Sequence, residues 1–224
     1  MRSQPERHSL AVSRPSAVSK YVKFIYECAC AEIAPFDKFA ELNHCRQKLL
    51  ELGVIGVDST GISFGNLSVR DGATKNFHIT GAATRGLPEL SPTDCVRVVA
   101  YDFQRNSLRC EGTAIPSSES LTHAAIYESD TMARAVIHCH DSALWASLLS
   151  RAPTSSRRVS YGTPEMAYEI MRLFKVSDLQ TRRIWVMAGH ESGIVTFGRD
   201  FDEAFAALIR ERNESSPCVS SPFS

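Results

Sequence analysis

The feature that most restricts the fold is a run of short alternating segments in the middle of the chain, separated by turn residues. Residues 61–70 (GISFGNLSVR) and 76–80 (NFHIT) alternate polar and apolar side chains and contain many β-branched and aromatic residues. Asp-Gly, Pro and Asn signals lie between such segments, which is typical of consecutive antiparallel strands. The same criteria predict further strands at residues 95–101, 107–111, 133–139, 184–187 and 194–197.

Helical patterns lie on both sides of this β-rich stretch. The clearest covers residues 39–52, where apolar residues recur at helical spacing and Gly53 provides a stop. Ser117 or Ser118 can cap a helix that runs to about Ser129, and Asp141 can cap another. The full set of predicted helices is 21–34, 39–52, 117–129, 142–149, 165–174 and 201–212. Strands with helices before and after them predict a layered α/β domain.

The chain divides into three zones. Its 224 residues, 43% of them apolar, suffice for one sizeable core, which we place in residues 20–212. Residues 213–224 (NESSPCVSSPFS) have the composition of a disordered tail. Residues 1–19 form a polar, proline-containing leader, which fits either an ordinary disordered segment or a transit peptide.

Charge and cysteine content narrow the function classes. The 25 basic and 25 acidic residues balance, which argues against a broad nucleic-acid-binding surface. No apolar run approaches the length of a membrane span. The seven cysteines are odd in number and include no C-x-x-C pair, which favours free thiols in a reducing, cytoplasmic compartment.

The strongest chemical signal is the pair His138 and His140, at the end of an apolar strand (AVIHCH). Side chains of a strand alternate between its faces, so both imidazoles point to the same side. Such a pair supplies half of a tetrahedral zinc site, and a third ligand must come from elsewhere. Among His44, His78, His123 and His190, we favour His190 because it lies in a turn between two predicted strands.

Glu119 has two interpretations. It follows Pro116 and two serines at a predicted helix start, and acidic residues favour the first turn of a helix. Alternatively, its carboxylate lies beside the metal and acts as a general acid or base. Composition alone favours the structural interpretation.

Several segments could offer hydroxyls and amides to an anion. Asn66 follows a glycine within a predicted strand, which indicates a bulge or a close ligand approach. The Thr80–Gly81 turn and the pair Ser117 and Ser118 add further donors. Each segment is equally consistent with an ordinary turn, and no Walker or G-x-G-x-x-G motif supports nucleotide binding.

Taken in order, these motifs resemble the class II aldolase/adducin family. The matching segments are GNLSVR at 65–70, FHITG at 77–81, LSPTD at 90–94, PSSESLTHAAIY at 116–127, AVIHCH at 135–140 and GHESGIVTFGRDFDEA at 189–204. The resemblance covers residues 42–208 and depends on the agreement of several short motifs rather than on any long one.

The resemblance implies a three-layer α/β/α fold around a mainly antiparallel sheet. It implies a divalent metal, usually zinc, held by His138, His140 and His190; manganese or cobalt would also suit three imidazoles. It assigns Glu119 to catalysis, and it assigns phosphate binding to Asn66, Thr80, Gly81, Ser117 and Ser118. Members of the family are usually homotetramers with sites at subunit interfaces.

The implied reaction is a lyase reaction on a small hydroxycarbonyl compound such as a sugar phosphate, through an enediolate. Dehydration of a ketose phosphate is an alternative, and a non-catalytic adducin-like interaction domain is another. The chain departs from the family pattern in three places. Glu191 and Ser192 separate His190 from Gly193, the loop after Thr80 reads GAATRG, and the segment after His140 is short. This last segment lacks the usual proton-donating tyrosine, and we do not assign that role to Tyr161.

Overall fold

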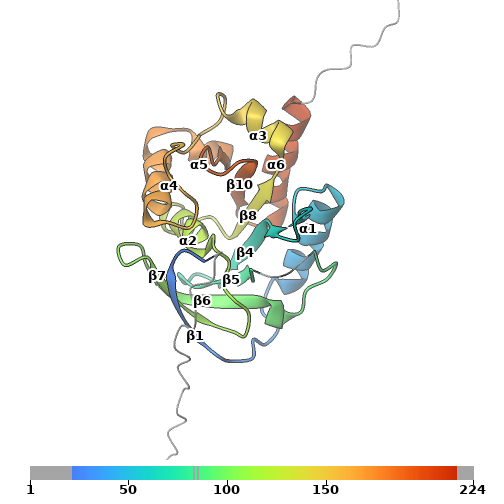
Figure 1. Ribbon diagram of the computed structural model, residues 1–224, viewed down its shortest axis with the longest axis vertical. Coiled ribbons are helices and arrows are strands. Elements are labelled where there is room, and N and C mark those ends of the chain that lie inside the picture. The colour runs from blue at the N-terminus through green and yellow to red at the C-terminus, as the bar shows by residue number, and fades with distance from the viewer. Residues whose placement is uncertain (1–21, 83, 85, 216–224) are drawn as a thin grey trace, which may run out of the picture.

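The computed structural model describes residues 22–82, 84 and 86–215, so the leader at 1–19 and most of the tail at 213–224 lie outside the described residues (Figure 1). The strands are β1 (Ile25–Ala29), β2 (Gly56–Val57), β3 (Ser63–Phe64), β4 (Asn66–Arg70), β5 (Phe77–Thr80), β6 (Cys95–Asp102), β7 (Ser107–Glu111), β8 (Ala135–His140), β9 (Ile184–Val186) and β10 (Gly193–Gly198). The helices are α1 (Phe39–Glu51), the short 3₁₀ helix η1 (Pro92–Asp94), α2 (Ser120–Ser129), α3 (Ser142–Leu148), α4 (Pro164–Val176), α5 (Leu179–Arg182) and α6 (Phe201–Ser215).

Eight strands form one sheet in the order β1-β7-β6-β5-β4-β8-β10-β9. Every neighbouring pair is antiparallel except β1 and β7, which run parallel. The prediction of a mainly antiparallel central sheet is therefore confirmed. β8 lies between β4 and β10, so it is hydrogen-bonded on both sides and is held rigidly in the middle of this half of the sheet.

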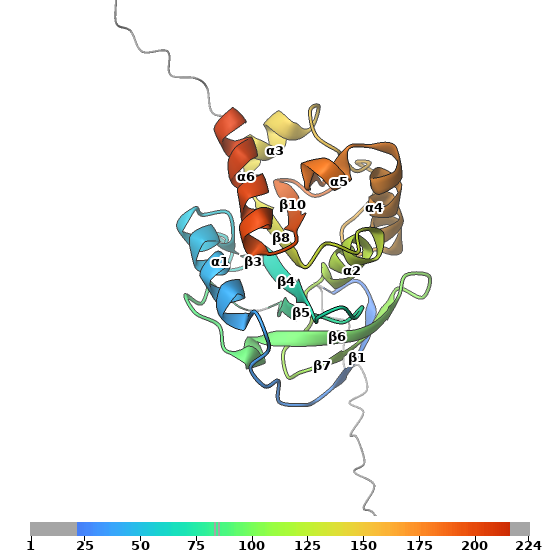
Figure 2. The ribbon, with the colours of Figure 1, turned by 180° about the vertical axis from the view of Figure 1, so that it is seen from behind.

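Helices cover both faces of the sheet and complete the three layers. Helices α2 and α4 lie on one side, whereas α1, α3 and α6 lie on the other (Figures 1 and 2). The alternation of β8 reflects this arrangement: Val136 packs toward α2, and Ile137 packs into the core beneath α6. Two hydrophobic cores thus form, one on each face of the sheet.

The prediction of a helix at residues 21–34 is wrong. Residues 25–29 form the edge strand β1, paired in parallel with β7. The segment IYECA contains Ile and Tyr, which favour strands, and short apolar runs do not distinguish the two structures by periodicity alone. The long-range pairing with β7 satisfies its backbone and decides the outcome.

The other predicted elements are found with small shifts. The strand predicted at 61–70 is interrupted at Gly65, which has φ +79° and lies so close to Ile55 that a Cβ there would be 2.4 Å from its Cγ2. The helix predicted from Ser117 or Ser118 begins at Ser120. The final helix continues beyond residue 212 to Ser215, whereas α5 and β2 were not predicted.

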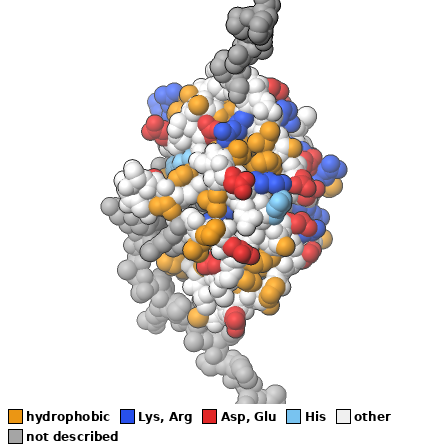
Figure 3. Space-filling model, turned by 90° about the vertical axis from the view of Figure 1, so that its right-hand side faces the viewer, with side chains coloured by type: hydrophobic (Ala, Val, Ile, Leu, Met, Phe, Trp, Pro, Cys, Tyr) orange, Lys and Arg blue, Asp and Glu red, His pale blue; other side chains and the backbone are white. Residues whose placement is uncertain are grey.

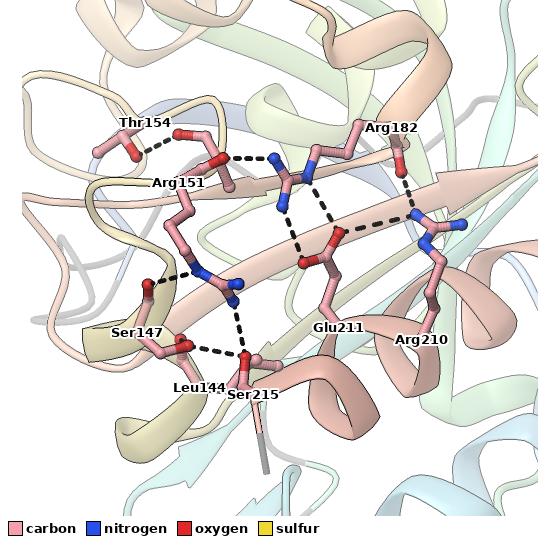
Figure 4. A network of polar contacts seen from close by, with 9 residues as sticks. Leu144, Ser147, Arg151, Thr154, Arg182, Arg210, Glu211 and Ser215 are labelled. Carbon is pink, nitrogen blue, oxygen red and sulfur yellow. Dashed lines mark hydrogen bonds and ion pairs between the residues drawn. The ribbon is translucent and has the colours of Figure 1, made fainter. Parts of the chain in front are cut away.

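A buried ion pair fixes the end of α6. Both carboxylate oxygens of Glu211, which is only 2% exposed, accept hydrogen bonds from Arg182 at 3.0 and 2.9 Å. Arg182 also donates to the carbonyl of Arg151, and Arg210 donates to the carbonyl of Arg182 at 2.8 Å (Figure 4). Ser215 accepts hydrogen bonds from Ser147 and Arg151, both at 2.9 Å. These contacts join α6 to α3 and α5.

One face of the molecule shows the balanced charge composition. Acidic and basic side chains are interspersed on the face over α1 and α6 (Figure 3). Lys38 and Glu41 form one exposed pair there, at 2.8 Å. None of the helices in the described part of the chain combines the length and apolar character needed to cross a membrane.

Candidate metal centre and active site

The site begins at the end of β8. His138 and His140 project from the same face of this strand, as predicted, with ring centroids 5.1 Å apart. Asp141 then ends the strand, and its Oδ1 accepts a hydrogen bond from the amide of Leu144 at 3.0 Å, capping α3 as predicted. The two imidazoles therefore sit on a rigid strand end.

His190 joins this pair from the turn between β9 and β10. The Nε2 atoms of His190 and His140 are 2.9 Å apart, and the nearest ligand atoms of all three histidines lie within 4.8 Å of one another. Gly193 makes this approach possible, since a Cβ there would be 2.6 Å from Cδ2 of His190. The structure thus brings together the three residues that the sequence analysis selected.

The other histidines do not converge on this cluster. His44 is exposed on α1, and His78 stacks on Phe36 with ring centroids 3.8 Å apart. His123 lies on α2, where its Nδ1 is 2.7 Å from Oγ of Ser68. It is fully buried, and burial lowers its pKa to about 3.

The environment keeps the three clustered imidazoles neutral. Burial lowers the pKa of His140 and of His190 to about 4, and burial together with the neighbouring histidines holds the pKa of His138 well below its usual value. A neutral imidazole has a lone pair available for a metal, whereas a protonated one has none. The cluster is therefore in a ligand-competent state at neutral pH.

His138 carries a more specific indication of a ligand. Its Nε2 is buried and has no hydrogen-bond partner, while its Nδ1 lies 3.2 Å from the side-chain nitrogen of Asn66, whose Oδ1 also lacks a partner. If the Asn66 amide is turned over, Oδ1 accepts a hydrogen bond from Nδ1–H, and Nε2 presents its lone pair to a metal. The three histidines and Asn66 thus fit a divalent metal.

Glu119 occupies the N-cap position of α2, yet its carboxylate makes no capping hydrogen bond. The residue therefore lies at the helix start, as the structural interpretation expects, but its side chain does not cap the helix. The residue is 2% exposed, and neither carboxylate oxygen has a hydrogen-bond partner at normal distance and angle. Burial raises its pKa to about 7, although the nearby Thr122 hydroxyl and the charge of Lys23 favour the ionised form. A buried carboxylate with that pKa exchanges a proton readily near neutral pH.

A cavity of about 890 Å³ contains these groups. Its lining includes Glu119, the three clustered histidines and the predicted anion-binding residues Asn66, Gly81, Ser117 and Ser118. Thr80 is not part of the lining; it is buried, and its hydroxyl accepts a hydrogen bond from the amide of Leu67 at 3.2 Å.

The backbone of the predicted phosphate turn is already engaged. The amide of Gly81 donates to the carbonyl of Asp94 at 2.8 Å, and the amide of Ala82 donates to the carbonyl of Ile115 at 2.9 Å. Neither amide is oriented toward an anion in the cavity. Donors on this side come instead from the side chains of Asn66, Ser117 and Ser118.

Several residues of the lining were given no role from the sequence, among them Phe64, Tyr161 and Arg212. The ring of Tyr161 lies 4.4 Å from that of His190, and Lys23 places its Nζ 3.6 Å from the centroid of the Tyr161 ring. Phe64 lies 5.3 Å from the ring of His140, and Arg212 reaches the cavity from α6. No local pattern marks these residues, because each enters through long-range packing.

The family of this protein follows from its match to known sequences. The model of the class II aldolase and adducin N-terminal domain family matches residues 57–211. This match spans more than half of the chain, and the protein belongs to this family. No curated protein matches the chain.

Solved structures share the fold at low sequence identity. An L-fuculose 1-phosphate aldolase is 23% identical with a TM-score of 0.61, covering 82% of this chain and 84% of that one. An L-fuculose-1-phosphate aldolase from Thermus thermophilus is 19% identical, with a TM-score of 0.56 and coverages of 79% and 90%. A sugar-phosphate aldolase from Thermotoga maritima is 15% identical, with a TM-score of 0.59 and coverages of 80% and 92%.

Proposed function

We propose that this protein is a metal-dependent carbon–carbon lyase that acts on a small hydroxycarbonyl compound. The observation that carries this proposal is the placement of three neutral imidazoles and a buried, unpartnered Glu119 around one cavity. Buried polar atoms without partners are costly, and natural proteins retain them mainly where a ligand or a reaction uses them.

His138, His140 and His190 would hold the metal, with zinc the first choice and manganese or cobalt also compatible with three nitrogen ligands. When bound, such an ion acts as a Lewis acid that polarises a substrate carbonyl and stabilises developing negative charge. Asn66 would orient His138 through the Nδ1 atom, which fixes the ring nitrogen that faces the metal.

Glu119 would move the proton. Its pKa of about 7 places it where it can accept a proton from a hydroxyl or carbon and return it within the same cycle. The residue is only 2% exposed, which limits exchange of that proton with solvent. The side chains of Asn66, Ser117 and Ser118 would hold the oxygens of the substrate on the same side of the sheet.

The adducin-like alternative is disfavoured by the same cluster, since an interaction domain has no need for three converging histidines with depressed pKa values. Cleavage and dehydration both require Glu119 and the metal ligands. Product analysis separates them, because cleavage yields two carbonyl fragments and dehydration yields one product that has lost water.

The test uses full-length protein purified without chelators and incubated with a panel of ketoses and ketose phosphates. The proposal expects a stoichiometric divalent metal and cleavage products that disappear in Glu119→Gln. The matched control, Glu191→Gln, alters an exposed carboxylate in the nearby turn and should retain turnover. Wild-type protein without a divalent metal, or Glu119→Gln with undiminished cleavage, would contradict the proposal.

We also propose that the protein assembles as a homo-oligomer, expected to be a tetramer. Leu52, Ile62 and Ile115 line the cavity and are 37%, 43% and 43% exposed, which leaves apolar area at its mouth for another copy to cover. Light scattering of the wild type and of Ile62→Asp tests this assembly. A monomeric wild type at micromolar concentration would exclude it.

A further inference from the structure

Two free thiols lie opposite each other where the edge strand β1 meets β7. The two strands pair in parallel, and Cys28 of β1 is the direct partner of Cys110 of β7 (Figure 2). Both side chains pack against the core on the side of α2 and α4. Neither residue lines the cavity that contains the three clustered histidines. The pair therefore has no part in the proposed reaction.

The pairing brings the two cysteines within reach of a disulfide bond. Neighbouring strands lie about 4.7–4.9 Å apart, and the Cα atoms of bonded cysteines are usually about 4.4–6.8 Å apart. The thiol of Cys28 donates to the carbonyl of Gly112 at 3.6 Å, which leaves its sulfur free to accept a hydrogen bond from the thiol of Cys110. The two sulfurs are thus already in contact.

The position of β1 permits the small movement that bond formation requires. β1 is the first strand in the order of the sheet, and β7 is its one strand neighbour within the described residues. A strand that is bonded on one side shifts more easily than one held on both sides. The sulfurs can therefore close to bonding distance without disturbing the centre of the sheet.

The two thiols differ in exposure and in acidity. Cys28 is partly exposed, whereas Cys110 is only 2% exposed. The hydrogen bond between them lowers the pKa of Cys28 and raises the pKa of Cys110. Because the thiolate is the reactive form, an oxidant from solvent meets Cys28 first. Cys110 is protected from solvent and stands ready to react with the oxidised sulfur.

The other cysteines of the described part of the chain lack this combination. Cys45, Cys95 and Cys139 are buried, and burial raises the pKa of each thiol. Cys30 is exposed, but it lies beyond the paired residues of β1 and faces no cysteine on β7. Cys28 and Cys110 thus combine one accessible thiol with one protected partner.

From these observations we propose that Cys28 and Cys110 form a peroxide-sensitive dithiol that closes into a disulfide between β1 and β7. The sulfur of Cys28 attacks hydrogen peroxide, the O–O bond breaks, and a sulfenic acid forms with release of one water. The sulfur of Cys110 then attacks that of Cys28, the S–S bond forms, and the S–O bond breaks with release of a second water. Two thiols are oxidised to one disulfide, and one peroxide is reduced to two waters.

The disulfide would act on a segment that touches the cavity wall. Lys23, just before β1, places its Nζ 3.6 Å from the centroid of the Tyr161 ring, and Tyr161 lines the cavity. The carbonyl of Lys23 accepts a hydrogen bond from Asn106 at 2.7 Å. A covalent bond between β1 and β7 adds to these contacts and holds the segment more firmly. The inference does not depend on the proposed lyase reaction.

Peptide mapping tests whether the bond forms. Full-length protein is treated with a small excess of hydrogen peroxide, its remaining thiols are alkylated, and it is digested with trypsin without reducing agent. We expect peptide 24–38, which contains Cys28 and Cys30, to be linked to peptide 110–134, which contains Cys110. Dithiothreitol should separate the two peptides again.

Variants assign the bond to one residue of the first peptide. Cys28→Ser and Cys110→Ser should abolish the link between the peptides. Cys30→Ser is the matched control, because Cys30 lies two residues from Cys28 in the same peptide and is more exposed. It should form the link as readily as the wild type does.

Thermal unfolding gives a second measurement. The disulfide closes a loop of some eighty residues, so oxidation should raise the Tm by about 5 °C or more. The Tm of each variant is compared before and after oxidation, so a loss of stability caused by the substitution itself cancels. Cys30→Ser should show the same rise as the wild type, and Cys28→Ser should show none.

Three results would overturn the proposal. They are a peroxide-treated wild type without the linked peptides, a link that persists in Cys28→Ser, and an equal rise in Tm on oxidation of the wild type and Cys28→Ser.

Discussion

Two buried polar clusters in this molecule differ in whether their polar atoms have hydrogen-bond partners. In the cluster around Glu211, both carboxylate oxygens accept hydrogen bonds from Arg182, and Arg210 approaches the same carboxylate (Figure 4). In the cluster around His138, the Nε2 of His138 and both carboxylate oxygens of Glu119 lack partners. Both lie beside helices that cover the sheet, yet only one is internally satisfied.

The difference indicates what each cluster is for. A fully paired carboxylate gains nothing from an external ligand, so the Glu211 cluster serves to fix α6 against α3 and α5. The unpaired atoms around His138 carry a desolvation cost that the free protein does not recover. A bound ligand can recover it, and this asymmetry distinguishes the functional cluster from the structural one.

The largest expected effect comes from removing metal ligands. His138→Ala and His140→Ala should lower bound divalent metal from about one per chain to roughly a tenth or less, since a three-histidine site lacks a spare ligand. Elemental analysis of protein purified without chelators measures this content. His44→Ala, on the exposed face of α1, is the control and should keep the metal. Equal metal content in all three variants would remove the basis for calling this cluster functional.

Substitutions in the Glu211 cluster should change the free energy of unfolding without changing the metal content. Glu211→Leu leaves the Arg182 guanidinium without its partner and should reduce the free energy of unfolding by about 3–5 kcal/mol in urea titrations. The double variant Arg182→Met with Glu211→Leu should recover much of that loss, because apolar residues can replace a buried pair. Glu41→Gln, in the exposed pair with Lys38, should change stability by less than about 0.5 kcal/mol. If Glu211→Leu lost its metal at temperatures where it stays folded, the Glu211 cluster would not be purely structural.

Glu119 should make the metal-free protein less stable as the pH rises. Its pKa is raised from 4.5 to about 7 in the folded state, so the unfolded chain ionises first and gains relative stability across that range. Metal-free Glu119→Gln avoids this loss and should gain about 3 kcal/mol over the wild type between pH 5 and pH 8. The histidines, whose pKa values are lowered, act in the opposite direction below pH 6.5, and the comparison of the two proteins cancels them. If the stability of the two proteins changed equally with pH, the pKa of Glu119 would not be raised in the folded state.

The smallest expected effect concerns the residue that supports His138. Asn66→Ala should leave the three histidines in place and weaken metal affinity by about tenfold, because the imidazole loses the partner that fixes its orientation. Competition with a chromophoric chelator measures this change. Asn43→Ala, which removes a buried amide hydrogen-bonded to the backbone of Leu90, is a control that should affect stability without affecting metal affinity.

The sequence predicted the elements whose signals are local. The period of α1, the cap at Asp141 and the strand AVIHCH were all found where expected. Alternation along a strand places His138 and His140 on one face whatever the rest of the chain does. His190 could be selected because a turn between two strands presents its side chains at a sheet end.

Tertiary structure decided the features that depend on distant partners. Residues 25–29 form a strand because β7 offers an unpaired edge, and a helix was predicted from their local pattern. The amides of Gly81 and Ala82 are bonded to carbonyls of distant segments, which no local motif reveals. Burial leaves the Glu119 carboxylate without partners and raises its pKa, because desolvation depends on the entire surrounding core.

The sequence by itself thus determined the class of fold and the three histidines, because short-range periodicity fixes which side chains share a face. Only the packed structure decided that the carboxyl group of Glu119 is buried and does not cap the helix that begins after it. It also decided that Arg212, some 70 residues along the chain from His140, lines the same cavity. Both results depend on how the helices pack against the sheet, and such packing leaves no regular spacing in the sequence.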